Sequence, residues 1–575
     1  MDCVVAEDDV HPIALLTEEV KSDEVETRIK AMRRLKTVAQ ALGAERARTE
    51  LVPFLRGATD DEDEVLVALA EELGGFVDLI GGPQYASVLV EPLEVLAGVE
   101  ETVVRDRAVD SLLKVVAVLP NVGDTFAPLL KRLAEGDWFT SRVSACSLFA
   151  AVYPKISDAA RRKELRDSFQ LLSNDDTPMV RRAAASNIGK EHLSTLVLPL
   201  FKALTGDDQD SVRLLAIENS AAIAKLLSPD ENIQNVLPIV RSSVEDRSWR
   251  VRFSIAKDFY PLSEAMGTQI TESELVGCFA NLLQDSEAEV RAASAKNIAG
   301  YVTIVKSDLF SNDILPLLST LSQDTAPNVR TAVSIACMEL APRLGEVASK
   351  NTLAPLLLLF LRDEVVDVRL NILKRLNLLA QWMSSFESVL LPAIADLARD
   401  LQWRVREAVI LSIPAIAGSL GNQYFQEHLL EIYISAFKDM VGEVRLSATK
   451  ILPELLASVG SDYILQNIIP ALTQIFDKSI IYQERVNVLH GLKQLASDKA
   501  SPELMSALIA LAIRGARDKI PNVKFVASIT LEQLCKYAES TIVSSQVRPC
   551  LTELVNDTDA DVKYFASLAL DAVQA

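Results

Sequence analysis

A motif that recurs at a constant spacing of about 39 residues, without a gap through the middle of the chain, most limits what this sequence can fold into. Each copy reads Asp, four variable residues, Val and a basic residue, and the basic residues of four successive copies are Arg252, Arg291, Arg330 and Arg369. A fixed period of this length is typical of repeat proteins, in which each unit packs mainly on its neighbours.

The period continues towards both ends and predicts fifteen units, with nearly constant steps and a single short one. The equivalent positions are Arg28, Leu66, Arg105, Arg142, Arg181, Arg213, Arg252, Arg291, Arg330, Arg369, Arg406, Arg445, Arg485, Lys524 and Lys563. Proline recurs fourteen residues before this position at Pro128, Pro199, Pro238, Pro316, Pro355, Pro392 and Pro549. The short step lies between Arg181 and Arg213, and it places a seven-residue deletion between Val180 and Leu198.

Within one unit, Asn312–Leu340, two apolar sets with helical spacing flank a polar turn. The unit is therefore predicted to be a helix bent at Pro316, a short turn and a second helix. Asp324 is expected to bond backbone amides of the turn. Arg330 would stand in the first turn of the second helix, where a cation opposes the helix dipole and needs a partner. An Asp of a neighbouring turn would supply that partner, so the sequence predicts an Asp–Arg ladder along one edge.

Composition agrees with stacked helices, because 49% of the 575 residues are hydrophobic and only 6% are aromatic. The formal charge of −21 argues against nucleic acid as the main partner, since phosphate binding needs a basic surface. No apolar run approaches the length of a membrane span; Leu353–Leu361 is among the longest and Pro355 interrupts it. We therefore expect a cytoplasmic protein, with the nucleus as a second compartment, and no insertion in a membrane.

The sequence lacks the patterns of catalysis: it has no phosphate-binding loop, no nucleophile elbow and no HExxH motif. We expect no catalytic residue, no cofactor and no metal site. The cysteines have no CxxC spacing and are expected to be free thiols: Cys3, Cys146, Cys278, Cys337, Cys535 and Cys550. The histidines show no metal-ligand spacing and are interpreted as ordinary surface or core residues: His11, His192, His428 and His490.

Three of the four tryptophans lie in the predicted turns, shortly before the basic residue of the repeat: Trp138, Trp249 and Trp403. A Trp beside Arg250 or Arg404 has the composition of an interface hot spot. Trp382 lies late in a second helix and is interpreted as a core residue. Turn residues rich in Trp, Arg, Met, Pro and Tyr form two groups, in repeats four to seven and eleven to fifteen. We interpret them as two partner sites on one ridge of turns.

Two helices per unit, with Pro, Asp and Arg at these offsets, resemble HEAT repeats. The armadillo alternative has three helices in slightly longer units. The expected fold is an all-α solenoid, a superhelical horseshoe of about fifteen HEAT repeats. No linker interrupts the array, so residues 1–575 are predicted to form one elongated domain, with repeats one to ten at about 1–400 and eleven to fifteen at about 388–575.

Several turn segments are more specific than a general HEAT pattern, among them Asp175–Ala185 (DDTPMVRRAAA), Ser248–Arg252 (SWRVR) and Asp561–Ala566 (DVKYFA). They resemble the scaffold (regulatory A) subunits of protein phosphatase 2A. The resemblance implies a non-catalytic scaffold of a heterodimer or heterotrimer, which holds a variable regulatory B-type subunit on turns one to ten and the serine/threonine phosphatase catalytic subunit on turns eleven to fifteen.

The resemblance also implies site residues. The positions carried over for the regulatory subunit comprise Trp138, Phe139, Pro178, Met179, Arg182, Asp210, Ser211, Trp249 and Arg250. The positions carried over for the catalytic subunit comprise Trp403, Arg404, Val441, Gly442, Tyr482, Pro521 and Asn522.

The chain departs from the family pattern at Gln402, at the deletion near Gly189 and in the apolar turn of repeat thirteen, Ser479–Gln483. An importin-type transport receptor, which is also an acidic HEAT solenoid, remains the alternative function.

Overall fold

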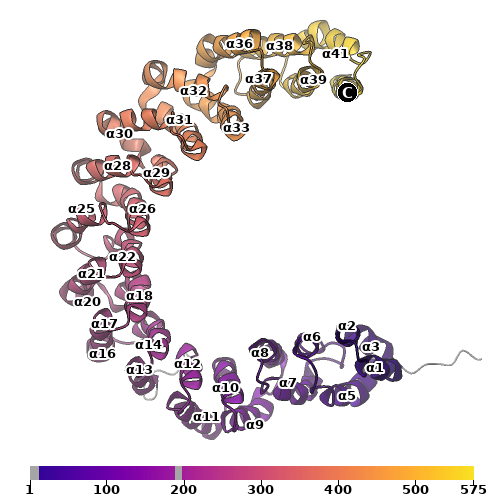
Figure 1. The fold of residues 1–575 in the computed structure, drawn as a ribbon, viewed down its shortest axis with the longest axis vertical. Coiled ribbons are helices and arrows are strands. Elements are labelled where there is room, and N and C mark those ends of the chain that lie inside the picture. The colour runs from indigo at the N-terminus through magenta and orange to yellow at the C-terminus, as the bar shows by residue number, and fades with distance from the viewer. Residues whose placement is uncertain (1–11, 188–196, 575) are drawn as a thin grey trace, which may run out of the picture. The chain divides into compact units, whose positions relative to one another are not determined.

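A computed structural model describes residues 12–187 and 197–574, and its contacts divide the chain into two compact units, residues 1–278 and 279–575. All regular elements in the described residues are helices, arranged in consecutive antiparallel pairs. Within each unit the first helices of the pairs form one layer and the second helices form the other (Figure 1). The prediction of an all-α solenoid of HEAT repeats is confirmed.

In the first unit the layer of first helices contains α1 (Pro12–Val20), α4 (Ala44–Arg46), η1 (Ala47–Leu51), α5 (Val52–Arg56), η2 (Pro83–Leu89), α7 (Val90–Leu96), α9 (Val122–Ala134), α11 (Ala159–Ser173), α13 (Leu198–Thr205), α16 (Pro229–Asn235), α17 (Leu237–Val244), α20 (Thr268–Ile270) and η5 (Thr271–Leu275). The second helices are α2 (Val25–Arg33), α3 (Leu35–Leu42), α6 (Asp63–Leu73), α8 (Thr102–Val118), α10 (Phe139–Val152) with η3 (Tyr153–Lys155), α12 (Pro178–Ser186), α14 (Asp210–Ile217), α15 (Ser220–Ala224), α18 (Trp249–Lys257) and α19 (Phe259–Met266). The boundary between the units falls inside α21 (Val276–Leu283).

In the second unit the first helices are α24 (Ser307–Leu309), η6 (Phe310–Ile314), α25 (Leu317–Leu321), α27 (Glu346–Ala348), η7 (Ser349–Leu353), α28 (Ala354–Leu361), α30 (Met383–Leu397), η9 (Phe425–Leu429), α32 (Leu430–Ala436), α35 (Ser461–Tyr463), η10 (Ile464–Ile468), α36 (Ile469–Lys478), α38 (Pro502–Ala516), α40 (Ser540–Ile542), η11 (Val543–Val547) and α41 (Arg548–Leu554). The second helices are α22 (Ala288–Ala295), α23 (Ile298–Tyr301), α26 (Pro327–Leu344), α29 (Val366–Leu373), η8 (Leu376–Trp382), α31 (Trp403–Tyr424), α33 (Gly442–Lys450), α34 (Leu452–Val459), α37 (Tyr482–Gln494), α39 (Pro521–Cys535) and α42 (Ala560–Gln574).

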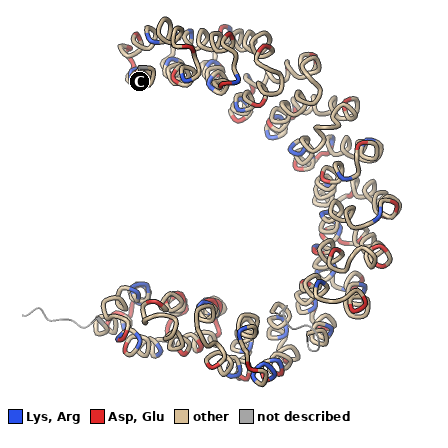
Figure 2. The backbone as a smooth tube through the Cα atoms, turned by 180° about the vertical axis from the view of Figure 1, so that it is seen from behind, with Lys and Arg blue, Asp and Glu red and all other residues tan. Residues whose placement is uncertain are grey.

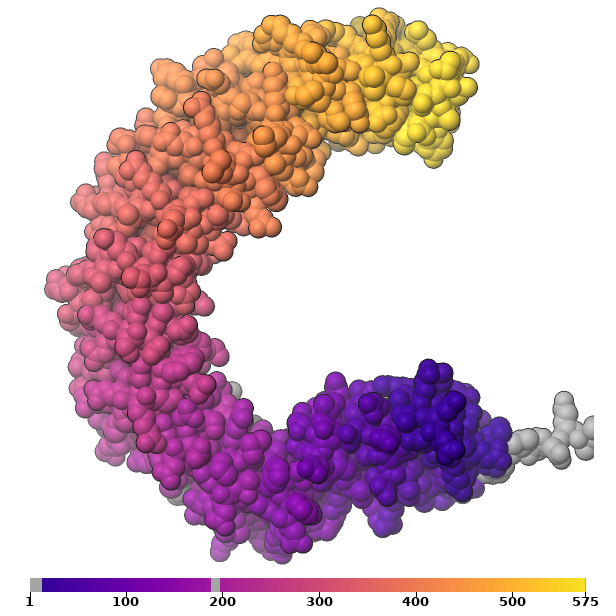
Figure 3. Space-filling view, in the orientation of Figure 1, coloured from indigo at the N-terminus to yellow at the C-terminus, as the bar shows by residue number. Residues whose placement is uncertain are grey.

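The core of each unit lies between the two layers, because each helix turns an apolar stripe towards its neighbours. In α38 the stripe is Leu504, Leu508 and Ala512, which are spaced four residues apart and fully buried. In α39 it includes Val523 and Ala527, also fully buried. Because consecutive repeats bury these stripes against one another, they pack closely along each unit (Figure 3).

In several repeats the proline of the first helix follows a short π-helical stretch, a feature that the sequence did not reveal, whereas Pro128 and Pro392 lie inside the α-helices α9 and α30. Pro316, Pro355 and Pro549 each stand two residues after a five-residue π segment, namely η6, η7 and η11. A π turn shifts the hydrogen-bond register next to a residue that has no N–H to donate. The π segment η5 has Gly277 at the same place, so the bulge does not require proline.

Glycines with a left-handed backbone join many of the repeats. Gly43, Gly267, Gly345 and Gly460 follow a second helix and precede the next first helix, whereas Gly421 breaks α31 near its end; all five have φ between 78° and 88°. A side chain is strained in this conformation, whereas glycine adopts it at little steric cost. These residues therefore end one repeat and start the next within a single residue.

One helical stretch, Leu376–Leu397, is long and apolar enough to cross a membrane by length and composition alone, with mean hydropathy 1.2. The expectation that no stretch approaches this length was therefore wrong, because η8 and α30 follow one another directly. Its buried side chains include Leu379, Met383, Phe386 and Leu390, which recur every three or four residues. This periodicity is typical of a core helix pair in a repeat array.

The shortened repeat keeps its place in the stack. The second helix α12 is nine residues long and ends at Ser186, whereas the predicted deletion near Gly189 lies among residues 188–196, outside the described part of the chain. Arg181 still reaches an aspartate of the next turn, at 26 residues instead of the usual 33. The deletion therefore shortens the repeat without changing the contact between neighbouring turns.

Candidate protein-binding turns

The turn between the two helices of a repeat is built around one aspartate and one arginine. In the turn that precedes α26, Asp324 Oδ1 accepts a hydrogen bond from the amide of Ala326 (2.9 Å), as expected from the sequence. Arg330 Nη1 donates to the carbonyl oxygen of Asp324 (2.9 Å), while its Nε donates to Asp363 of the following turn (2.7 Å). A single arginine thus donates hydrogen bonds both to a backbone carbonyl of its own turn and to a carboxylate of the next turn.

The predicted ladder of such contacts is confirmed within both units. Pairs with nitrogen–oxygen distances between 2.5 and 3.2 Å are Arg28–Asp61, Arg142–Asp175, Arg181–Asp207, Arg213–Asp246, Arg291–Asp324, Arg330–Asp363, Arg369–Asp400, Arg406–Asp439, Arg485–Asp518 and Lys524–Asp557. Acidic and basic positions recur together along the chain (Figure 2). Most of these side chains are less than a fifth exposed, so their hydrogen bonds are stronger than those of surface ion pairs.

Several ladder aspartates have a pKa below the usual value for aspartate. Burial alone would raise the pKa of Asp324, but the hydrogen bonds from Arg291 and from the Ala326 amide outweigh it and lower the pKa below its usual value. The same causes lower the pKa of Asp363 and Asp439. These carboxylates are therefore ionised at neutral pH and contribute to the stability of the turns.

Within the described residues, the ladder has two places where the aspartate position facing an arginine holds another residue. Gly136 occupies the position that faces Arg105, whose Nη1 makes the usual bond to the carbonyl six residues earlier, here Val99 (3.0 Å), and whose Nη2 donates to Thr102 Oγ1 (3.1 Å) in place of a carboxylate. Ser479 occupies the position that faces Arg445. In both turns the residue six positions before the basic residue is not an aspartate, so both gaps in the ladder can be identified from the sequence.

Two of the predicted turn tryptophans present an arginine on their ring. The guanidinium carbon of Arg250 lies 5.5 Å from the ring centroid of Trp249, and Arg404 lies at the same distance from Trp403. Both tryptophans are the first residue of a second helix, α18 and α31, rather than part of the loop. Trp138, the residue before α10, is 76% exposed.

Residues of repeats six and seven form a connected polar cluster around Trp249. Ser248 Oγ donates to Asp210 Oδ2 (2.8 Å), and Arg250 Nη1 lies 3.7 Å from the same oxygen. The hydrogen bond from Ser248 and, to a smaller extent, the charge of Arg250 lower the pKa of Asp210. Trp249 also meets Phe253 edge to face at 6.4 Å. The structure thus brings together Asp210, Trp249 and Arg250, which the family resemblance assigned to one partner.

The site residues predicted from the sequence are half-buried or exposed in the structure, as a binding surface requires. Exposed members of the two sets are Trp138, Pro178, Met179, Arg182, Trp249, Arg250, Arg404, Gly442 and Asn522. Half-buried members are Phe139, Asp210, Ser211, Trp403, Val441, Tyr482 and Pro521. The first set, from Trp138 to Arg250, lies in the first unit and the second set, from Trp403 to Asn522, lies in the second unit. Their roles in binding partners stay predictions.

A row of exposed apolar side chains was missed from the sequence. Leu401, Met440 and Ile480 each follow the ladder aspartate position directly, in three successive turns, and are 98%, 90% and 96% exposed. The same position in other turns holds polar residues such as Glu364 and Lys519. We call Leu401, Met440 and Ile480 the apolar turn row. Comparing the residue after the ladder aspartate position in all repeats would have identified it from the sequence. Exposed apolar side chains gathered in this way mark protein interfaces.

Trp382 differs from the interpretation as a core residue. It is half-buried at the end of η8, where the chain passes directly into α30. The adjacent Met383 and Leu379 occupy the core positions instead, both at most 1% exposed. The helical pattern placed the indole in the second helix correctly, but the 3-10 turn of η8 rotates it partly out of the interior.

The described thiols and histidines are poorly suited to catalysis. Burial raises the pKa of Cys337 and of Cys146 to about 12, so both are protonated at neutral pH and weak nucleophiles. Burial also lowers the pKa of His490. The free-thiol prediction is confirmed for Cys146, Cys278, Cys337, Cys535 and Cys550, whereas Cys3, His11 and His192 lie outside the described residues.

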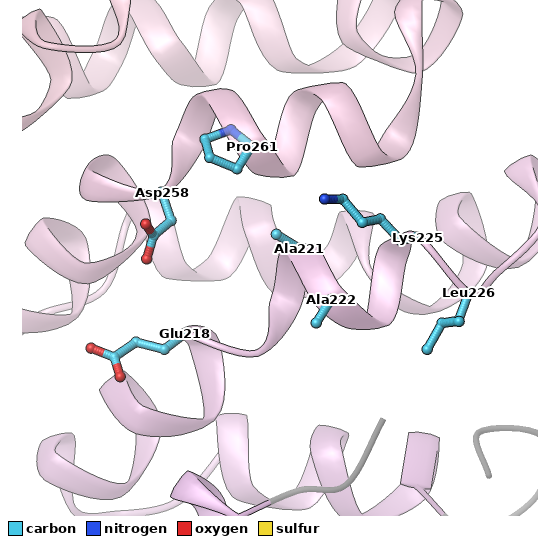
Figure 4. Close-up of a pocket in the computed structure, with 7 residues that line it drawn as sticks. All are labelled: Glu218, Ala221, Ala222, Lys225, Leu226, Asp258 and Pro261. Carbon is cyan, nitrogen blue, oxygen red and sulfur yellow. The ribbon is translucent and has the colours of Figure 1, made fainter. Parts of the chain in front are cut away.

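A hollow of about 640 Å³ in the first unit is lined by Glu218, Ala221, Ala222, Lys225, Leu226, Asp258 and Pro261 (Figure 4). Glu218 and Asp258 extend towards the same side of it, and Lys225 lies apart from them in the view. Its lining side chains include two carboxylates and one lysine but no serine, cysteine or histidine.

The fold and its turns define a HEAT-repeat solenoid whose exposed chemistry lies in the turns. Residues 268–345 match the PPP2R1A-like HEAT repeat family.

Three relatives support the comparison. The chain is 47% identical over 276 residues to the regulatory (A-type) subunit of protein phosphatase PP2A from Schizosaccharomyces pombe, which covers 46% of this chain and 47% of that protein. It is 40% identical over 385 residues to the beta isoform of the human serine/threonine-protein phosphatase 2A regulatory (A-type) subunit, covering 64% of each. It is 41% identical over 289 residues to the protein phosphatase 2A scaffold subunit of Dictyostelium discoideum, covering 48% of this chain and 49% of that protein. The matches thus span about half to two thirds of the relatives' length, and over them the chain is similar to the PP2A scaffold subunits, as its turn motifs indicate.

Solved structures of karyopherins share the fold. A structure of Kap95p with RanGDP matches with a TM-score of 0.55 at 13% identity, over 97% of this chain and 83% of that one. A Kap121p mutant matches with a TM-score of 0.51 at 14% identity, over 98% and 74%. At such low identity the likeness shows a common solenoid and no common function.

Proposed function

We propose that this chain is a non-catalytic scaffold that assembles a serine/threonine protein phosphatase holoenzyme. The observation that carries the proposal is the chemistry of the turns in the second unit. There the Trp403–Arg404 pair and the apolar turn row stand on successive repeats, in a chain otherwise similar to PP2A scaffold subunits. Exposed apolar and aromatic side chains on a rigid repeat array suit a permanent protein partner better than a small molecule.

The phosphatase catalytic subunit would bind the turns of repeats eleven to fifteen. Trp403 with Arg404 would provide an aromatic and cationic anchor at one end of this site, and Leu401, Met440 and Ile480 would provide the apolar contacts. Such a division into an anchor and a surrounding apolar surface is common in tight interfaces.

A variable regulatory B-type subunit would bind the turns of the first unit. The cluster of Asp210, Ser248, Trp249 and Arg250 offers both charges and an aromatic face, and Trp138 offers a large exposed ring. This surface is more polar than the apolar turn row, which suits a partner that is exchanged. We propose the cytoplasm, with the nucleus as a second compartment, as the location of the assembly.

An importin-type transport receptor is the second candidate, supported by the shared solenoid fold alone. A capture experiment separates the two. The full chain is immobilised and offered a PP2A-type catalytic subunit or a Ran-type small GTPase loaded with GTP. The proposal expects retention of the phosphatase and not of the GTPase; the reverse result would favour a transport receptor.

A further inference from the structure

The ladder of the second unit is interrupted at a serine. Asp400, Asp439 and Asp518 each bind the basic residue of the preceding repeat, but the turn between the last two has Ser479 at this position. Among these turns, the one before α37 therefore lacks only the carboxylate, since the hydrogen bonds of its backbone follow the common pattern.

Ser479 keeps the backbone contacts of a ladder aspartate. Its Oγ accepts a hydrogen bond from the amide of Ile481 (3.1 Å), as Asp439 Oδ1 does from the amide of Val441 (2.8 Å). Its carbonyl oxygen accepts from Arg485 Nη1 (2.8 Å), as that of Asp439 does from Arg445 Nη1 (2.6 Å). Unlike a carboxylate, Ser479 Oγ also donates to the carbonyl oxygen of Ile481 (3.0 Å). In its contact with the Ile481 amide, the hydroxyl takes the place of the first carboxylate oxygen of an aspartate.

Arg445 is the arginine that this aspartate position would serve. It forms no ion pair with a described carboxylate, and its Nε is buried without a hydrogen-bond acceptor. The Nε atoms of Arg369 and Arg485 also lack a well-aligned bond, yet these arginines have a carboxylate oxygen at 3.2 and 2.7 Å. Arg445 is therefore a cation with an unsatisfied buried Nε, and by the pattern of the neighbouring rungs its carboxylate would come from the position of Ser479.

We propose that Ser479 is a phosphorylation site and that its phosphate completes the missing rung with Arg445. A protein kinase would supply the nucleoside triphosphate: the serine oxygen forms a bond to the γ-phosphorus, the bond to the diphosphate breaks, and the hydroxyl proton is released. The product carries a charge of about −1.5 to −2 at pH 7 and three acceptor oxygens, which suit a guanidinium.

Ser479 is half-buried, but the residues on either side of it, Lys478 and Ile480, are exposed, so this short segment is open to a kinase. Ser479, Ile480 and Ile481 separate α36 from α37; the backbone of Ser479 and of Ile481 is extended, and Ile480 is 96% exposed. At the other gap, Gly136 has no hydroxyl and Arg105 already has acceptors, so this site is specific to one turn. The inference concerns the chain itself and does not depend on the proposed phosphatase partner.

The test compares the full chain with serine or genetically encoded phosphoserine at position 479, each with Arg445 or with R445Q. We expect phosphoserine to raise Tm by about 2 °C and to slow amide exchange in α33 and α37 when Arg445 is present. We expect R445Q to remove most of both effects. An equal rise in Tm with R445Q, or no rise in Tm with Arg445, would show that the phosphate on Ser479 does not pair with Arg445.

Two further measurements complete the test. S479D, which supplies a carboxylate without a kinase, should raise Tm in the Arg445 chain and not in R445Q; the opposite dependence on Arg445 would contradict the proposed pairing. Mass spectrometry of the chain from eukaryotic cells treated with phosphatase inhibitor should find phosphate on Ser479. Its absence from a fully covered peptide would overturn the modification.

Discussion

At the scale of single residues, Trp403 and Arg404 combine a contact between an aromatic ring and a cation with a position at the surface of a turn. The guanidinium lies 5.5 Å from the centre of the indole, and Arg404 is exposed. The pair opens α31, directly after the exposed residues Leu401 and Gln402. An aromatic ring held by a neighbouring cation is ordered before a partner arrives, so less conformational entropy is lost on binding.

We expect Trp403→Ala to weaken catalytic-subunit binding about thirtyfold, the equivalent of ~2 kcal/mol, with little change in Tm of the free chain. The reason is that the ring contributes to the surface of the turn and only partly to the packing of the repeat. Affinity measured by biolayer interferometry and melting of the free variant check both parts.

Trp249→Ala is the matched control, because it removes an indole with the same arginine contact from the other set. It should leave affinity for the catalytic subunit unchanged. A large fall in Tm with unchanged affinity for Trp403→Ala would show that this tryptophan serves the fold instead.

A second residue-scale prediction compares two carboxylates that contact the same arginine. Arg330 binds Asp363, whose side chain is 8% exposed, and also Glu364 (3.3 Å), whose side chain is 85% exposed. We expect Asp363→Asn to lower the free energy of unfolding by about 1–3 kcal/mol, because it leaves a largely buried guanidinium without its ion pair. Glu364→Gln should change it by less than about 0.5 kcal/mol, because solvent screens exposed pairs. Equal effects in urea denaturation would mean that the ladder contributes no more than surface charge.

At the scale of elements, the ladder makes stability depend on pH. The folded-state pKa values of Asp175, Asp207, Asp324, Asp363 and Asp439 are lowered, so folding favours their ionised form. Their contribution is complete above the pKa of an unfolded aspartate, about 3.9, and is lost as the pH falls through the lower folded values. We expect Tm to fall steeply below about pH 4.

The same experiment on a chain with both Asp324→Asn and Asp363→Asn provides the control. Fewer titrating rungs should make the fall of Tm between pH 4 and pH 2.5 shallower. An identical acid profile for the two chains would assign the loss to other carboxylates.

The elements also show how far the sequence carried the prediction. The ion pairs of the ladder could be predicted from the repeated spacing of residues such as Asp324 and Arg330. An aspartate and an arginine that recur together carry opposite charges, so pairing between neighbouring turns was the simplest interpretation. The π segments did not follow, because a proline such as Pro316 is compatible with a kink, a cap or a bulge, and packing selects among them. Trp382 was misjudged because the 3-10 turn of η8 changes the helical phase by a fraction of a turn.

The candidate site was predicted in part for a related reason. Tryptophans are few and stand out in a turn, so the sequence singled out Trp138 and Trp249, which the structure shows to be exposed. Leu401, Met440 and Ile480 were not, because the chain is rich in aliphatic residues and only their position relative to the ladder distinguishes them from core residues.

At the scale of the whole molecule, the two predicted partner sites belong to different compact units, with the boundary at residues 278 and 279. In a repeat array, stability and contacts are dominated by terms between neighbours. We therefore expect a variant with Trp249→Ala and Asp210→Asn to lose affinity for the regulatory subunit only. A variant with Trp403→Ala and Met440→Ser should lose affinity for the catalytic subunit only.

Combining all four substitutions should change each affinity by the same factor as the corresponding pair alone, within about twofold. Calorimetric titration with each purified partner measures this. A clear departure in either direction would show that the two sites are energetically coupled.

Most rungs of the ladder join residues 33 positions apart, so repeats of equal length can replace one another. Arg291 meets Asp324 and Arg330 meets Asp363, each 33 residues ahead, and the two arginines are themselves one whole repeat apart. If residues 324–362 were excised as one block, Asp363 would arrive at the place of Asp324 and Arg291 would find the same carboxylate in the same turn. The length of such a chain can therefore grow or shrink by whole repeats during evolution or engineering. Such a change would alter the number of repeats between the two partner sites without altering the ladder itself.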